Sequence, residues 1–182
     1  MSLIAGRTGN ILNVVSKGRL PVQASGESEF AASSWIDGDA YCWATATADI
    51  AATETAILLC NNSTTKHLHI VKAYMYSDVP TQLQWHFPAY PTLAGTAITG
   101  VNLNRTSKNV APASCYADET GNTQANIFMT VSTNEVTGDQ RGLWLDFESA
   151  IILYYHDCIA MDVVADGAAF EAAIFGYFHT HD

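Results

Sequence analysis

Four of the six histidines occur as two His-x-His pairs, at positions 67–69 and 179–181. Alternate side chains of a strand share one face, so the imidazoles of a pair lie roughly 6 to 7 Å apart. Two such rings hold a metal only if a third ligand approaches, and a cupin-like site needs a Glu a few residues beyond the pair. The next acid after His69 is Asp78, beyond the expected strand. We therefore expect no metal site, and the candidate ligands are His67, His69, His179 and His181.

Other motifs that carry chemistry are missing from the sequence. It has no glycine-rich phosphate loop and no G-x-S-x-G nucleophile motif, so we expect neither enzymatic activity nor a cofactor. Aromatic residues at alternating spacing either fill a core or interface, or line a sugar-binding surface. The residues that would form such a surface are Trp35, Tyr74, Tyr76 and Trp85, within a wider set that includes Tyr90, Tyr154 and Tyr155.

The segment 56–87 predicts three antiparallel strands joined by two polar turns. Side chains alternate along a strand, so residues 68, 70, 72, 74 and 76 are expected on one face and residues 67, 69, 71, 73 and 75 on the other. Leu83, Trp85 and Phe87 alternate with polar residues in the third strand. The pattern is typical of a meander with one solvent-facing side.

The rest of the chain predicts more short strands with polar turns between them. Residues 40–47 and 168–179 also predict strands, although neither face of the last strand is polar throughout, which favours a central place in the sheet or cover by a neighbour. No window of eleven residues has a clear helical period. Strands at roughly 8 to 12 residue spacing favour an all-β sandwich or barrel. We predict an antiparallel, jelly-roll-like β-sandwich over residues 27–182, preceded by an extended N-terminal arm over residues 1–26.

The composition argues against a nucleic-acid partner. The formal net charge is −10, from 18 acidic against 8 basic residues, whereas nucleic-acid binding needs clustered Lys and Arg. Only 14% of the residues are charged, compared with about a quarter in a typical soluble domain. A surface so poor in charge is either covered by Ser, Thr, Asn and Gln or buried against other subunits, which makes self-association one expectation.

Cysteine spacing and hydropathy limit the cellular compartments in which we expect the protein. The four cysteines lie far apart without a CxxC motif, and those within apolar runs are expected to be small buried hydrophobes. We expect free thiols and no disulfide. No signal-peptide core and no apolar run near 18 residues is present, so a membrane partner is not expected.

The first 26 residues differ from the rest of the chain. All the charges before Glu27 are basic, and a short apolar stretch lies among them. These features indicate either an arm that packs on a partner or a solvated basic loop. The residues that we expect to mediate docking are Arg7, Ile11, Leu12, Val14, Val15, Lys17, Arg19 and Leu20.

Three segments resemble a loose group of tailed-bacteriophage virion proteins: NVVSKGRL at 13–20, CNNSTTKHLHIVKAYMY at 60–76 and GTAITGVNLNRTS at 95–107. The resemblance covers about half the chain, and departs at Gly18, where that group tends to have Asn. It implies a jelly-roll-like capsid decoration or fibre-base protein, made in the host cytoplasm and carried in the virion. It transfers no catalytic residue.

Three hypotheses follow. The first is a non-enzymatic virion protein that forms a homo-oligomer, expected to be a trimer, and contacts other virion proteins such as a major capsid protein through its arm. The second is a carbohydrate- or receptor-binding module that uses Trp and Tyr. The third is a cupin-like metal-dependent enzyme.

Overall fold

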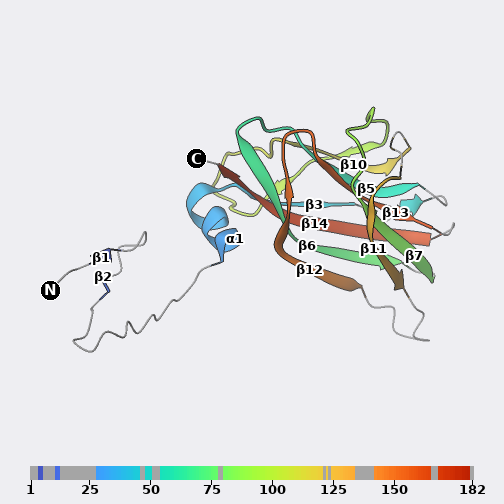
Figure 1. The fold of residues 1–182 in the computed structure, drawn as a ribbon, viewed down its shortest axis with the longest axis horizontal. Helices are drawn as coiled ribbons and strands as arrows, with labels where there is room; N and C mark the ends of the chain where they lie inside the picture. Colours follow the sequence, from blue (N-terminus) through green and yellow to red (C-terminus); the bar gives the residue numbers. More distant parts are fainter. Residues whose placement is uncertain are drawn as a thin grey trace.

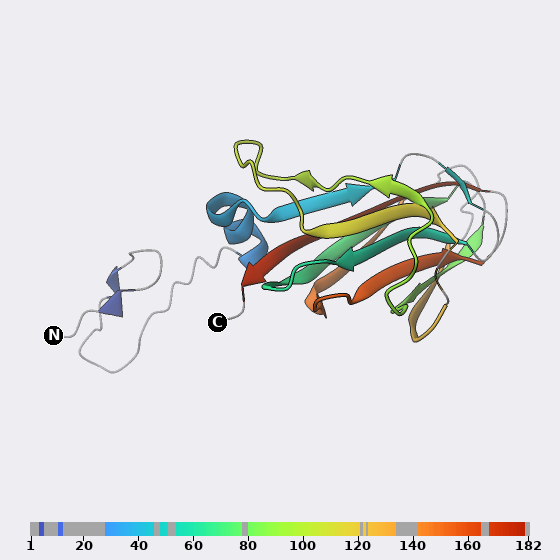
Figure 2. The ribbon, with the colours of Figure 1, turned by 90° about the horizontal axis from the view of Figure 1, so that it is seen from above.

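The computed structural model describes residues 4–5, 11–12, 28–45, 48–50, 54–77, 80–120, 122, 124–133, 142–164 and 168–180. Two antiparallel sheets pack face to face in this part of the chain, which confirms the predicted all-β sandwich (Figure 1, Figure 2). A separate pair of two-residue strands, β1 (Ile4–Ala5) and β2 (Ile11–Leu12), lies within the N-terminal 26 residues.

We name the two sheets after a central strand of each. The β5 sheet has the order β11-β7-β13-β5-β10-β8. Its strands are β5 (Thr55–Asn61), β7 (Thr81–His86), β8 (Thr96–Ile98), β10 (Ala113–Glu119), β11 (Ile127–Thr133) and β13 (Cys158–Val163). The β6 sheet has the order β12-β6-β14-β3-β9, and β4 pairs with β14. Its strands are β3 (Ala40–Ala44), β4 (Ala48–Ile50), β6 (Lys66–Ser77), β9 (Val101–Asn102), β12 (Leu143–Leu153) and β14 (Ala168–Thr180).

Eight of these strands pair in a nested order. The first pairs with the last (β3 with β14), the second with the seventh (β5 with β13), the third with the sixth (β6 with β12) and the fourth with the fifth (β7 with β11). A long antiparallel ribbon rolled into two sheets gives this order, which is that of a jelly roll. Strands β8, β9 and β10 belong to an insertion between β7 and β11 and extend both sheets at one side.

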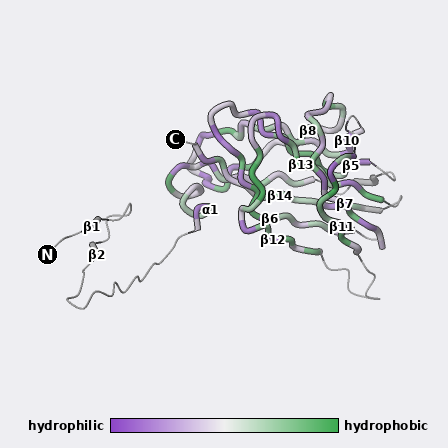
Figure 3. Tube along the Cα trace, in the orientation of Figure 1, coloured by the Kyte–Doolittle hydropathy of each residue, from purple (hydrophilic) through white to green (hydrophobic). Residues whose placement is uncertain are grey.

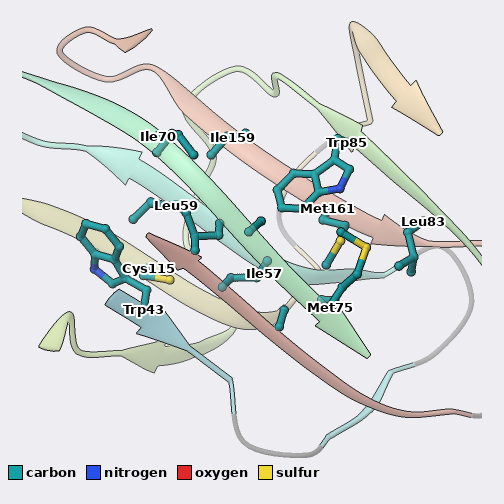
Figure 4. Close-up of a cluster of buried hydrophobic side chains, with 14 of the residues drawn as sticks. Trp43, Ile57, Leu59, Ile70, Met75, Leu83, Trp85, Cys115, Ile159 and Met161 are labelled. Carbon is teal, nitrogen blue, oxygen red and sulfur yellow. The ribbon is translucent and has the colours of Figure 1, made fainter. Parts of the chain in front are cut away.

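The core lies between the sheets. Trp43, Ile57, Ile70, Trp85 and Met161 are fully buried there and come from five different strands (Figure 4). The expected alternation holds in β3, β7 and β14. In β14, the core residues Phe170, Ala172, Ile174 and Phe178 alternate with outward-facing ones.

In β6 the predicted face assignment is wrong after Ile70. Leu68, Ile70, Ala73 and Met75 all face the core, because a bulge at residue 71 inserts one extra residue opposite β14. A one-residue insertion moves every later side chain to the other face. Gly176 lies opposite the bulge, where a Cβ would come within 2.7 Å of the His69 carbonyl oxygen.

A short helical segment covers one end of the outer face of the β6 sheet. Helix α1 (Glu29–Ala32) is followed directly by the π-helical turn η1 (Ser33–Asp37). The Ala31 N–H donates to the Ser28 hydroxyl and caps α1, as Ser at this position commonly does. Gly38 ends the segment with φ 64°, a conformation that favours glycine. The C-terminal end of β14 lies at the same end of the sandwich, which we call the α1 end (Figure 1).

Hydropathy follows this arrangement. The strands carry most of the hydrophobic residues, and many hydrophilic residues lie in the loops (Figure 3).

Candidate functional site

The outer face of the β6 sheet carries a group of aromatic side chains, of which one is exposed and two are half-buried. Trp144 on β12 is 54% exposed and lies opposite Tyr74 on β6, with 5.0 Å between the ring centroids. The Phe175 ring on β14 lies 5.8 Å from Trp144. We call Lys72, Tyr74, Trp144 and Phe175 the aromatic patch. Its side chains point away from the core because their neighbours Ala73, Leu145 and Ile174 point into it.

Lys72 is held in the middle of the patch. Its ammonium lies 5.0 Å from the ring centroids of both Trp144 and Phe175. A cation between two ring faces is attracted by the quadrupole of each ring. Asp146 on β12 is the residue paired with Lys72 in register, so the patch has one cation with an acid beside it.

Three of the four candidate metal ligands lie together at the α1 end. His67 and His179 are cross-strand partners, and the His69 ring stacks on Tyr177 with 4.9 Å between centroids. The fourth, His181, lies outside the described residues. Among the residues that the structure describes, no group of three or more His, Cys, Asp or Glu is placed to hold a metal ion.

Tyr177 connects this histidine group to α1. Its hydroxyl donates to Glu29 at 2.7 Å, and the Phe30 ring lies 6.2 Å from its ring. Burial, and then the nearby Glu29 carboxylate, raise the pKa of Tyr177 to about 12. The contacts therefore fasten the helical segment to the outer face of the sheet.

A polar recess of about 330 Å³ opens beside the turn that joins β5 to β6. The Lys66 ammonium pairs with the Asp39 carboxylate at 2.5 Å, and the Asn109 side chain donates to the same carboxylate at 3.0 Å. Burial, and then the Asp39 charge, raise the pKa of Tyr41 to about 12. The two charged groups of the recess thus neutralise each other and hold the 109–112 loop against the sandwich.

A buried His–Asp pair lies on the outer face of the β5 sheet. His86 Nε2 is 3.0 Å from Asp162 Oδ1, and Thr55 donates to the same carboxylate at 2.6 Å. A base that activates a hydroxyl must contact that hydroxyl itself, but here Thr55 contacts the carboxylate and His86 is fully buried. Gln124 donates to Asp162 at 3.1 Å, so the network fastens the segment before β11 onto the sheet.

The cysteine prediction is wrong for two of the four residues. Cys60 on β5 and Cys158 on β13 are directly opposite each other, with 4.1 Å between Cα atoms, and form a disulfide. Cys42 and Cys115 are free. Burial raises the pKa of both thiols, most strongly that of Cys115, so both are expected to be poor nucleophiles.

The predicted aromatic surface is only partly brought together. Tyr74 belongs to the aromatic patch, and Tyr76 lies on the same outer face two residues further along β6. Trp85 does not belong to it, because its side chain is fully buried in the core. Trp35 lies in η1, and its side chain is outside the described part of the chain.

The predicted docking arm falls almost wholly outside the described residues. Of its candidate residues, the backbone of Ile11 and Leu12 forms β2, while the rest lie outside the described part: Arg7, Val14, Val15, Lys17, Arg19 and Leu20.

Trp144 and Phe175 were not among the predicted site residues. Each occupies an alternate position between core residues of an apolar strand, and this alternation was the signal that could have placed them on a sheet surface. Trp144 and Phe175 come together because β12 and β14 both pair with β6, and the sequence alone does not reveal this pairing.

No family model, curated protein or solved structure matches the chain. Within the described residues, no helix has the length and apolar character needed to cross a membrane.

Proposed function

We propose that the protein is a non-enzymatic structural component of a bacteriophage virion, which self-associates and docks to a capsid or tail assembly. The observation that carries the proposal is the aromatic patch on the outer face of the β6 sheet. Trp144, Tyr74 and Phe175 gather there around a single lysine.

The composition of the patch favours contact with another protein. Trp, Tyr and Phe are enriched in protein interfaces, and residues that dominate binding energy are often Trp or Tyr. The patch is also suited to further copies of the same chain, because Lys72 of one copy can pair with Asp146 of the next in a head-to-tail ring.

The edge of the same sheet is protected against a different mode of association. Strand β12 is a sheet edge, and an exposed edge can add strands from another molecule. Its pairing shifts register between Asp146 and Ile151, and Glu148 and Ser149 have φ of 49° and 61°. Because this bulge interrupts the edge, association through the face of the sheet is favoured over strand addition.

Three further properties support the structural role. Jelly rolls are a common architecture of viral capsid proteins. Only 14% of the residues are charged, so much of the surface is uncharged and available for contact with another protein. The resemblance of residues 13–20, 60–76 and 95–107 to virion proteins points the same way.

Replacing the exposed indole tests self-association. We expect Trp144→Ala to weaken the contact between copies by about 2 kcal/mol or more if Trp144 is a dominant contact residue, which is roughly thirtyfold per interface. Chemical cross-linking and gel filtration at matched concentrations would measure the loss. Tyr155→Ala is the control, because Tyr155 is 50% exposed but lies on a turn outside the patch. Equal effects of the two substitutions, or none, would contradict the proposed contact.

Deleting residues 1–26 tests docking. The truncated chain is expected to keep the circular-dichroism spectrum of a folded sandwich and to lose attachment to the larger assembly. A truncated chain that still occupied that assembly fully would show that the arm is not required.

A further inference from the structure

The turn between β12 and β13 exposes three ring side chains in succession. Tyr154 is 52% exposed and Tyr155 is 50% exposed. The Tyr155 ring stacks on the ring of His156, with 3.7 Å between centroids. Tyr90 comes from the loop after β7, and its ring lies 4.2 Å from that of His156. We call Tyr90, Tyr154, Tyr155 and His156 the tyrosine turn.

Hydrogen bonds fix the backbone of this turn. Tyr154 and Asp157 exchange two bonds: the Tyr154 N–H donates to the Asp157 carboxylate at 2.9 Å, and the Asp157 N–H donates to the Tyr154 carbonyl at 3.0 Å. The His156 N–H donates to the Asn61 carbonyl at 2.8 Å, and the Asn61 N–H donates to the Asp157 carbonyl at 3.0 Å. His156 is held at φ 66°, a conformation that costs energy in a residue with a side chain and is concentrated at functional sites.

A covalent bond and a buried amide fix the same turn from below. The disulfide joins Cys60 and Cys158, the residues adjacent to Asn61 and to the end of the turn. The Asn61 side chain is fully buried and donates to the carbonyls of Leu153 at 2.8 Å and Lys66 at 2.9 Å. Hydrogen bonds and the disulfide therefore fix the backbone that carries the exposed rings in the absence of a ligand.

Polar groups lie at the rim of the rings. The Tyr90 hydroxyl donates to the Asn62 side-chain oxygen at 3.3 Å, and the Asn62 amide donates to the Ser114 hydroxyl at 2.6 Å. Tyrosine hydroxyls both donate and accept. A ligand on the rings would thus find hydroxyl and amide groups beside the apolar faces.

We infer that the tyrosine turn is a binding site for a neutral saccharide. A pyranose ring has an apolar face of C–H bonds, which carry partial positive charge and suit the negative face of an aromatic ring. Its edge is made of hydroxyls, which suit the phenol and amide groups at the rim. Rigid rings reduce the ordering cost of binding, and Tyr loses little side-chain entropy.

Two other ligand classes fit this site less well. Bases of a single-stranded nucleic acid also stack on aromatic rings, but their binding requires cations along the backbone, and this chain has a net charge of −10. A protein interface needs about 1,000 Å² or more of buried surface with an apolar centre. The tyrosine turn is instead one short turn, and the polar side chain of Asn62 lies beside its rings. The site goes beyond the structural role and does not depend on it.

Saturation-transfer NMR on the full chain would test the inference. The probes are linear oligomers of glucose, galactose, mannose and N-acetylglucosamine at about 10 mM, which populates even complexes with millimolar Kd. At least one oligomer is expected to bind. Tyr155→Ala is expected to weaken binding about tenfold or more, whereas Tyr155→Phe, which keeps the ring, should retain most of it.

Trp144→Ala is the matched control, because its indole is as exposed as the Tyr155 ring but lies in the aromatic patch. It should bind saccharide like the unsubstituted chain while losing self-association. The inference is overturned if no oligomer binds, if Tyr155→Ala binds as well as the unsubstituted chain, or if Trp144→Ala weakens binding equally. A failure of the self-association test would contradict the proposed structural role but would not bear on saccharide binding. The two proposals can therefore be refuted independently.

Discussion

Removing the disulfide between Cys60 and Cys158 should be among the most destabilising changes outside the core. The bond joins residues 98 positions apart. In the chain-entropy model, closing a loop of this length lowers the conformational entropy of the unfolded chain, which raises the free energy of unfolding by about 4.7 kcal/mol at 25 °C. Native disulfides of small domains contribute about 2 to 5 kcal/mol. We therefore expect the double variant Cys60→Ala/Cys158→Ala to lose free energy of unfolding within this range.

Urea unfolding followed by circular dichroism would measure that loss. The unsubstituted chain should lose the same stability when reduced in urea, and the double variant should not respond to reductant. The Cys42→Ala/Cys115→Ala variant is the control, because it removes the free thiols and keeps the bond. Thiol titration of the unfolded, unreduced chain should find two reactive groups. Four thiols, or equal stability of the chain with and without reductant, would refute the argument.

Two further changes test the buried tyrosines and the bulge in β6. The pKa values of Tyr41 and Tyr177 are raised from 10.0 to about 12, so the protonated phenols favour the folded state below pH 10 and this contribution is lost as the pH rises toward 12. Thermal unfolding should show that Tyr41→Phe/Tyr177→Phe is less sensitive to alkali than the unsubstituted chain, and equal sensitivity would contradict the shifts. Gly176→Ala should lower the free energy of unfolding by about 1 to 3 kcal/mol, because the added Cβ meets the His69 carbonyl. Ala173→Ser on the outer face of the same strand should change it by less than about 0.5 kcal/mol, and equal stability of the two variants would argue against the bulge.

The alternation of side chains explains why much of the sandwich was predictable. In β3, β7 and β14 the residues expected on one face lie at every second position, and they form the core. The prediction for β6 failed from residue 71 onward, because nothing in the run from His67 to Tyr76 marks a bulge. The bulge becomes visible only from the partner strand, where Gly176 admits the close approach of the backbone.

The errors at candidate sites have a similar physical origin. Cys60 and Cys158 lie in separate strands, and their contact depends on the register of β5 against β13. Trp85 has the alternation of a strand residue, which does not say which face is covered. The aromatic patch joins residues from three strands, so the sequence could mark Tyr74 as a surface candidate but not its contact with Trp144 or the place of Phe175 beside it.

The same limit applies to the tyrosine turn. Tyr154 and Tyr155 were recognised as surface candidates, but their rigidity comes from Asn61, which lies about ninety positions away in the sequence. Short-range patterns predict that a turn occurs there, and only the fold shows what holds it in place.

The mass of the full chain in solution tests the central claim most directly. One chain has a mass of 19.6 kDa. Light scattering over a series of concentrations is expected to find a homo-oligomer, and a trimer, which the sequence led us to expect, would have the mass of three chains. A mass of one chain at every concentration would contradict the claim that the aromatic patch and the charge-poor surface serve self-association.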